Sequence, residues 1–302
     1  MIDWTETKLL DKGLIDKYIK DGRRKKSTIT YPSRDGSSDT TLHRIHNLQL
    51  KAAPKTTTLG GSLHSFHNAL NGFTSGHPKH KWVNYNDFTY SDLLEIINWL
   101  ERSLSYDLTQ TSITLCEFGF NLKLDMSPKE FLENHVSMYK FRTPCKDPKY
   151  RDDMKIKKFE LDDYYLKIYD KSLQFNLDEN ILRIEVGFKT DILRDYGIES
   201  LKDLTCTDKL DGLFGKMLNI YDDLLIVDRY DGCREMSGTE VRKIIKYTHP
   251  QHWIDLLGEK RYSTRSTHKA ELQSLLQKYG LDSRKNYLRQ LIIDEYRYLL
   301  YN

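Results

Sequence analysis

Three stretches of alternating apolar and polar residues constrain the fold of this chain more than any other feature. They cover Ser112 to Leu124, Tyr164 to Phe175, and Asn180 to Lys189. In a strand, a period of two places apolar side chains on one face and polar side chains on the other. Strands of this kind form antiparallel sheets that are covered on one side only. We therefore expect an α+β protein with a central antiparallel sheet, helices on one face, and an open polar face.

The second and third of these strands are expected to pair with each other. A short polar link, Asn176 to Glu179, joins them and is typical of an antiparallel hairpin. The polar face of the sheet would then collect charged and phenolic side chains from all three strands. These are Glu117, Lys167, Tyr169, Lys171, Arg183 and Glu185.

The rest of the chain divides into a basic N-terminal part and a helical C-terminal part. Helical spacing over residues 1–20 predicts a helix, and residues 27–31, 41–51 and 56–68 have the pattern of strands. From about residue 191, apolar residues spaced by three and four predict a series of helices. We expect three parts: residues 1–55 with a basic helix and strands, residues 56–190 with the sheet, and the helical residues 191–302.

Composition excludes several classes of protein. No stretch approaches 18 consecutive apolar residues, so no membrane span is expected. The first residues lack the basic-then-apolar pattern of a secretory signal. The 4 cysteines contain no CxxC pair, which argues against a disulfide scaffold and a zinc ribbon. A reduced protein of the cytoplasm is expected.

Charge is distributed unevenly along the chain. Residues 1–60 contain 12 Lys and Arg against 7 Asp and Glu, and residues 234–302 contain 13 against 8, whereas residues 61–233 contain 22 against 29. Basic ends can attract a polyanion, although ordinary solvated surface explains the same counts. The candidate DNA-binding residues are Arg23, Arg24, Lys25 and Lys26, and, on a predicted helix, Arg242, Lys243 and Lys246. The C-terminal helices fit either a helix-turn-helix unit or a small bundle with a basic surface.

Two isolated carboxylates are the candidate metal ligands. Glu117 and Glu185 each stand among apolar residues, in different strands. Carboxylates suit Mg²⁺ or Mn²⁺, while solvation of an open sheet face is the alternative explanation. The histidine pairs of the chain are three residues apart and never two, so no strand places two histidines on one face. Among single histidines we favour His64, which leads out of an expected strand.

Tyr169 is the candidate nucleophile. It lies between Lys167 and Lys171. A tyrosine has a pKa of about 10 and is a poor nucleophile until its phenolate is favoured. Lysines on the same face, or a nearby metal-bound phosphate, would favour that phenolate. The alternative is a tyrosine that only pairs across the hairpin.

These residues resemble a known family. The run Tyr165-Leu-Lys-Ile-Tyr-Asp-Lys171, followed by Leu182-Arg-Ile-Glu-Val-Gly-Phe-Lys189, resembles the Tyr-Asp-Lys and Arg-x-Glu core of the replication initiation factor family of plasmids and filamentous phages. Residues 61–64, 86–89 and 117–121 resemble motifs of a Bacteroidetes phage- and plasmid-borne branch. The resemblance covers roughly residues 56–205. It implies a degenerate HUH, or Rep-like, nicking fold without paired histidines, and a catalytic role for residues 56–190.

The resemblance implies a metal-dependent, site-specific single-strand DNA endonuclease that starts rolling-circle replication by nicking and joining DNA. Tyr169 would attack a phosphodiester, form a 5′-phosphotyrosine and free a 3′-hydroxyl. Tyr165, on the same face, competes for this role. Lys167, Lys171 and Arg183 would offset charge in the transition state. Glu117 and Glu185, with His64, would hold Mg²⁺ or Mn²⁺.

The implied partners are an origin duplex or hairpin and the single strand at the nick, in the cytoplasm of a bacterial host. Host replication proteins are further candidate partners, and the oligomeric state is open. Two other functions stay open at this point. One is a non-catalytic, sequence-specific DNA-binding protein of the same fold. The other is a structural or interaction protein whose charged faces are only solvated.

Overall fold

The computed structural model describes residues 1–10, 28–31, 40–53, 55–75, 81–145, 156–230 and 235–302. Four of the candidate DNA-binding residues, Arg23, Arg24, Lys25 and Lys26, lie outside the described residues. The same holds for residues 11–20 of the helix expected near the N-terminus.

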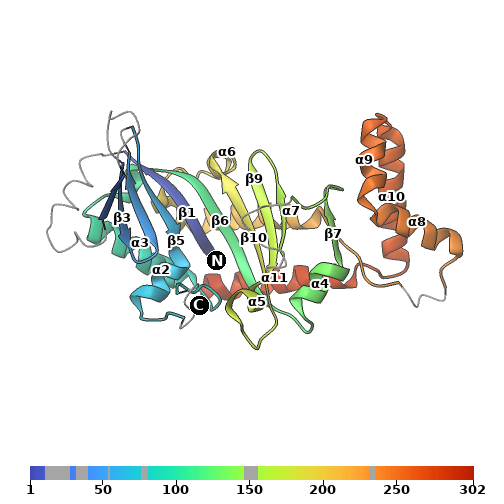
Figure 1. Ribbon diagram of the computed structural model, residues 1–302, viewed down its shortest axis with the longest axis horizontal. Coiled ribbons are helices and arrows are strands. Elements are labelled where there is room, and N and C mark those ends of the chain that lie inside the picture. The colour runs from blue at the N-terminus through green and yellow to red at the C-terminus, as the bar shows by residue number, and fades with distance from the viewer. Residues whose placement is uncertain (11–27, 32–39, 54, 76–80, 146–155, 231–234) are drawn as a thin grey trace.

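The described residues form a nine-stranded antiparallel sheet, which confirms the predicted α+β class (Figure 1). Its strands lie in the order β2 (Thr28–Tyr31), β3 (Thr40–Ile45), β4 (Leu48–Ala52), β5 (Thr57–Ser62), β1 (Ile2–Leu9), β6 (Thr111–Lys123), β10 (Ile181–Lys189), β9 (Tyr164–Asp170) and β8 (Ile156–Glu160). The strands β7 (Val136–Tyr139) and β11 (Leu224–Ile226) pair separately. The three strands expected from alternation are therefore neighbours in the sheet, as β6, β10 and β9.

Strands β9 and β10 pair antiparallel, as the hairpin prediction requires. Their register places Arg183 opposite Tyr169 and Glu185 opposite Lys167. Strand β9 ends at Asp170, five residues before the expected end, because the Asp170 side chain accepts a hydrogen bond from the backbone N–H of Leu173 and caps the helix α5 (Lys171–Phe175). Lys171 therefore begins a helix and does not lie on the strand.

Two local predictions near the N-terminus are wrong. Residues 2–9 form β1 and not a helix, since β1 inserts between β5 and β6 and its ladder outweighs the local helical spacing. Residues 63–68, expected to extend a strand, belong to helix α2 (Leu63–Leu70). Ser62 starts that helix, because its side chain accepts a hydrogen bond from the backbone N–H of Ser65.

Helices cover the apolar face of the sheet. The helices of this layer are α3 (Tyr90–Leu104), α6 (Thr190–Asp195), α7 (Thr207–Asp222) and α11 (Ser283–Tyr301), with α4 (Pro128–Asn134) and short 3-10 helices at Leu108–Gln110 and Leu201–Thr205. Phe120 of β6 packs against Phe214 of α7 and Tyr296 of α11, at 6.1 and 6.2 Å between ring centroids. Figure 1 shows α11 running along the sheet. The main hydrophobic core lies between these layers.

Three further helices form a lobe at one end of the long axis of the molecule (Figure 1). They are α8 (Gly238–Thr248), α9 (Pro250–Gly258) and α10 (Tyr262–Lys278), and they pack around a second hydrophobic cluster that includes Tyr247, Trp253 and Leu272. Within the described ranges, every helix is too short or too polar to cross a membrane. The division into residues 1–55, 56–190 and 191–302 stays a prediction.

Candidate active site

The polar face of the sheet is buried, so the expectation of an open face is wrong. Glu117, Lys167 and Tyr169 are 9%, 9% and 8% exposed, and Arg183 and Glu185 are each 2% exposed. No separate layer of helices was expected on this face. The side chains on this face bond to one another, and Asn84 from a connecting segment contacts the same group.

Two glycines make this close packing possible. A Cβ atom on Gly187 would lie 2.1 Å from Cζ of Tyr165, and a Cβ atom on Gly119 would lie 2.5 Å from Cβ of Glu185. Both distances are shorter than any van der Waals contact. The tyrosine ring and the glutamate stem therefore occupy the space that side chains at these positions would fill.

Lys167 holds the two predicted metal ligands together. Its Nζ donates hydrogen bonds to Oε1 of Glu117 at 2.6 Å and to Oε1 of Glu185 at 2.8 Å. Side-chain exposure is 11% for Lys167 and Glu117 and 3% for Glu185, so little water screens these pairs. The two strand carboxylates therefore lie side by side, as the sequence predicted, with a lysine ammonium bonded to both.

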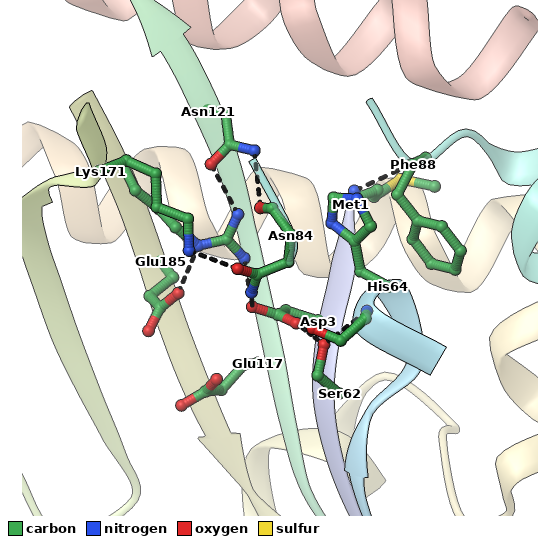
Figure 2. A network of polar contacts seen from close by, with 12 residues as sticks. Met1, Asp3, Ser62, His64, Asn84, Phe88, Glu117, Asn121, Lys171 and Glu185 are labelled. Carbon is green, nitrogen blue, oxygen red and sulfur yellow. Dashed lines mark hydrogen bonds and ion pairs between the residues drawn. The ribbon is translucent and has the colours of Figure 1, made fainter. Parts of the chain in front are cut away.

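A third carboxylate, Asp3 of β1, joins this cluster through Arg183. The guanidinium donates from Nη2 to Oδ2 of Asp3 at 2.8 Å and from Nε to Oε2 of Glu185 at 2.7 Å. Asn84 also donates to Oδ2 of Asp3, and Ser62 donates to its Oδ1. Figure 2 shows this network across β1, β6 and β10. Asp3 is not among the predicted site residues, because the spacing of residues 1–20 predicts a helix there.

Burial and neighbouring charges act differently on the three acids. Burial, with the charge of Glu185, raises the pKa of Glu117 to about 7. Burial opposes ionisation of Glu185 too, but Lys167 and Arg183 keep its pKa below the usual range. Burial likewise opposes ionisation of Asp3, and Arg183 lowers its pKa. Glu117 is thus the acid whose proton is most easily exchanged near neutral pH.

The two tyrosines each contact one glutamate. Tyr169 donates its hydroxyl to Oε2 of Glu185 at 3.4 Å, and Tyr165 donates to Oε1 of Glu117 at 2.5 Å. Burial, followed by the nearby carboxylates, raises the pKa of both phenols above its usual value. The expectation that Lys167 and Lys171 favour a phenolate is therefore wrong in the absence of DNA and metal, since burial and the glutamates raise the phenol pKa more than the lysines lower it.

Lys171 supplies an amine beside Tyr169. Its Nζ lies 3.5 Å from the hydroxyl of Tyr169 and donates to Oδ1 of Asn84 at 2.6 Å. The side chain is 1% exposed. Burial, followed by the charge of Arg183, lowers the pKa of Lys171 to about 7. This lysine can therefore exchange its proton near neutral pH, unlike an ordinary surface lysine.

The carboxylates fit a divalent cation. Oxygen atoms of Asp3, Glu117 and Glu185 all lie within 4.8 Å of one another. An all-oxygen set of three carboxylates suits Mg²⁺ or Mn²⁺. Such an ion would compete with the Lys167 ammonium for the glutamate oxygens, because Lys167 already bonds both. Asp3 thus adds a third carboxylate to the two glutamates that were predicted from the sequence.

His64 lies beside this group and not in it. Its Nε2 is 2.9 Å from Oδ1 of Asn86, and its ring stacks on Phe88 with centroids 5.0 Å apart. Burial, followed by nearby positive charges, keeps the pKa of His64 well below its usual value. A neutral imidazole is a competent ligand. As a metal ligand, however, His64 stays a prediction.

The remaining predicted residues lie in the C-terminal lobe. Arg242 and Lys246 are exposed on α8, and Lys243 on the same helix pairs with Glu271 at 3.4 Å. Figure 1 places α8 at the far end of the molecule from β1 and β6. A DNA-binding role for these residues is independent of the buried cluster and stays a prediction.

Further residues complete the cluster without having been predicted as site residues. Asn121 of β6 accepts a hydrogen bond from Nη1 of Arg183 at 2.9 Å, and Asn84 bridges Lys171 and Asp3. Asn121 could have been identified, since it lies on the polar face of its strand two positions beyond Gly119. Asn84 lies in a connecting segment without periodicity, where no pattern in the sequence distinguishes it.

Few known proteins resemble this chain in the comparisons of sequence and structure. No protein-family model matches the chain, and no curated protein sequence matches it. Among solved structures, the chain is similar to a rolling circle replication initiator protein from Geobacillus stearothermophilus. That match covers 77% of this chain and 88% of the other, with 11% sequence identity and a TM-score of 0.39. The likeness concerns the course of the backbone and not individual site residues.

Proposed function

We propose that this protein nicks and joins DNA to initiate rolling-circle replication, with a tyrosine as nucleophile and a divalent metal ion as cofactor. One observation carries the proposal. A single sheet face brings the hydroxyl of Tyr169 to 3.4 Å from a carboxylate oxygen and 3.5 Å from a lysine amine, beside a cluster of three carboxylates. Phosphoryl transfer to a phenol needs these groups: a nucleophile, a proton acceptor and positive charge.

The proposed reaction exchanges one phosphate ester for another. The phenol oxygen of Tyr169 bonds to phosphorus, and the bond between phosphorus and the 3′ oxygen breaks. The electron pair of that bond leaves with the 3′ oxygen, which takes a proton from solvent water and becomes a 3′-hydroxyl. The phenol proton passes to Lys171, whose pKa of about 7 suits a proton acceptor near neutral pH. The reverse sequence joins the ends again.

The cations of the site would bind and orient the scissile phosphate. Arg183 and Lys167 can offset charge on the non-bridging oxygens. Asp3, Glu117 and Glu185 would hold the metal ion, which supplies neutralisation of the phosphate when bound. Tyr165 is the competing nucleophile, because its hydroxyl also contacts a glutamate of the cluster. Its ring, however, packs against Gly187, which leaves it less free to move.

A random library of single-stranded oligonucleotides tests the proposal without knowledge of the origin. The protein is incubated with the library and Mn²⁺, denatured, and examined for covalently attached DNA. We expect an adduct whose peptide, by mass spectrometry, carries nucleotide on Tyr169. Tyr169→Phe removes only the hydroxyl and should abolish the adduct, whereas Tyr165→Phe should retain it. The opposite pattern would assign the reaction to Tyr165.

The two alternative functions give different results in the same experiment. A non-catalytic DNA-binding protein would retain oligonucleotides in a salt-dependent manner without forming an adduct. A structural or interaction protein would do neither. An absence of adduct on both single-stranded and supercoiled DNA, with Mg²⁺ as well as Mn²⁺, would refute the proposed nicking activity.

A further inference from the structure

A second group of metal-ligand side chains lies outside the candidate active site. It joins helix α2 to helix α3. Nε2 of His67 lies 3.4 Å from Oδ1 of Asp92 and 3.6 Å from Oε2 of Glu95. The three ligand atoms all lie within 4.8 Å of one another. The exposed fractions of these side chains are 14%, 27% and 59%, so the group is partly accessible to solvent.

The surrounding structure orients these ligands. Asp92 is the third residue of α3, and its Oδ2 accepts the backbone N–H of Thr89 in a capping box, while its other oxygen, Oδ1, faces His67. The imidazole of His67 packs on Phe88, with centroids 5.7 Å apart. Two of the three ligands are therefore held in place by contacts that do not involve a metal ion.

Asp92 and Glu95 have no permanently positive partner in the part of the chain that the structure describes. Among the residues that the structure describes, no lysine or arginine pairs with Asp92 or Glu95. Together the carboxylates carry two negative charges, and even a protonated His67 would compensate only one. A divalent cation would compensate both, which distinguishes this group from the active-site cluster, where three cationic side chains already meet three acids.

The distances fit a tetrahedral transition-metal site. Ligands that bind zinc at about 2.0–2.1 Å in a tetrahedron lie roughly 3.3–3.4 Å apart. The two distances from Nε2 of His67 are 3.4 and 3.6 Å, close to this spacing, and the carboxylate oxygens lie within 4.8 Å of each other. Nδ2 of Asn71 lies 3.0 Å from the same nitrogen, and this hydrogen bond would give way to the ion, whose coordination a water molecule can complete. An imidazole with carboxylates suits Zn²⁺ better than Mg²⁺, which prefers oxygen alone.

We propose that His67, Asp92 and Glu95 form a binding site for a divalent transition-metal ion of the Zn²⁺ class, which joins α2 to α3. The site is separate from the carboxylates of the candidate active site and does not depend on the proposed nicking activity. The ion would fix the position of α2, the helix that Ser62 caps. Since Ser62 also donates to Asp3 of the active-site cluster, the ion would stabilise the helix that borders that cluster.

Calorimetric titration of the full chain with Zn²⁺, in excess Mg²⁺ to occupy all-oxygen sites, tests this proposal. We expect His67→Gln and Glu95→Gln each to weaken Zn²⁺ binding by roughly tenfold or more. His249→Gln, a change of an exposed histidine at the junction of α8 and α9, is the matched control and should bind as the parent does. Co²⁺ in place of Zn²⁺ should give the intense visible absorption of a tetrahedral site, and both variants should lose it.

Melting temperatures in the presence of a chelator separate loss of ligands from loss of fold. Glu95 is 59% exposed, so Glu95→Gln should melt as the parent does without metal and gain less than the parent when Zn²⁺ is added. The proposal is refuted if the parent binds no Zn²⁺ under these conditions. It is equally refuted if His67→Gln and Glu95→Gln both retain the affinity and stoichiometry of the parent.

Discussion

Replacing Lys167 by methionine should lower the stability of the folded protein, because two buried carboxylates would lose the ammonium that they share. Methionine keeps most of the length of the side chain but removes the ammonium that bonds Glu117 at 2.6 Å and Glu185 at 2.8 Å. The two carboxylates would then face each other with 11% and 3% of their side-chain surface exposed. Removing one partner of a buried ion pair costs about 3–5 kcal/mol, because the remaining charge is left uncompensated.

The cost should depend on pH, with a sign that follows from Glu117. Its pKa in the folded protein is raised to about 7, so between the unfolded value and pH 7 the folded state binds more protons than the unfolded state. Stability contributed by this carboxyl therefore falls as pH rises towards 7 and then levels off. Without the Lys167 ammonium the folded pKa rises further, so the variant keeps losing stability above pH 7. We expect a larger destabilisation at pH 8 than at pH 6.

Urea unfolding at pH 6 and pH 8, followed by circular dichroism, measures this difference. Lys123→Met on β6 is the matched control. Lys123 pairs with Glu179 at 2.8 Å, but its side chain is 75% exposed, and its loss should leave the unfolding midpoint unchanged at both pH values. Mn²⁺ should stabilise Lys167→Met more than the parent, because the ion no longer competes with an ammonium. Equal destabilisation at both pH values, or a loss below about 1 kcal/mol, would refute this reasoning.

Four further variants test the packing of the sheet face, the metal ligands and the C-terminal lobe. In thermal unfolding, Gly187→Ala should destabilise the protein by about 1–3 kcal/mol, because the new Cβ would overlap the ring of Tyr165. Gly215→Ala on α7 is the control, since its new Cβ meets no atom within 4 Å, and it should stabilise the protein by about 0.5–1 kcal/mol. Glu117→Gln should weaken Mn²⁺ binding in calorimetry and lower nicking by orders of magnitude without affecting DNA retention. Changing Arg242, Lys243 and Lys246 together to Gln should weaken binding to duplex DNA and reduce its salt slope by roughly one unit per lost phosphate contact, and cleavage of short single strands should persist. An unchanged salt slope would assign these three residues to ordinary solvated surface.

Strand periodicity explains why the centre of the fold could be predicted. The strands β6, β9 and β10 each alternate over seven or more residues, and the structure places all three next to one another. The same alternation predicted that Glu117, Lys167, Tyr169, Arg183 and Glu185 share a face. It could not predict how far that face is buried, because burial depends on side chains lying across Gly119 and Gly187 from neighbouring strands.

Residues contributed from a distance could not be predicted in the same way. Asp3 reaches the cluster because β1 lies between β5 and β6. Its pairing with β6 joins residues more than a hundred positions apart and leaves no local pattern. Asn84 reaches it from a connecting segment, through hydrogen bonds to Lys171 and Asp3. The sequence therefore predicted the charged residues within each strand, but not the third carboxylate or the amide that completes the network.

The charge balance of the cluster connects Lys171 to the proposed reaction. Asp3, Glu117 and Glu185 match Lys167, Lys171 and Arg183, so the cluster is neutral when all six are ionised. A divalent ion and one phosphodiester together add a single positive charge. Release of one proton from Lys171 removes that surplus, and burial has already lowered its pKa to about 7. The same amine lies 3.5 Å from the hydroxyl of Tyr169. Lys171 would therefore restore neutrality when substrate and metal bind, and it is also placed to accept the proton of the nucleophile.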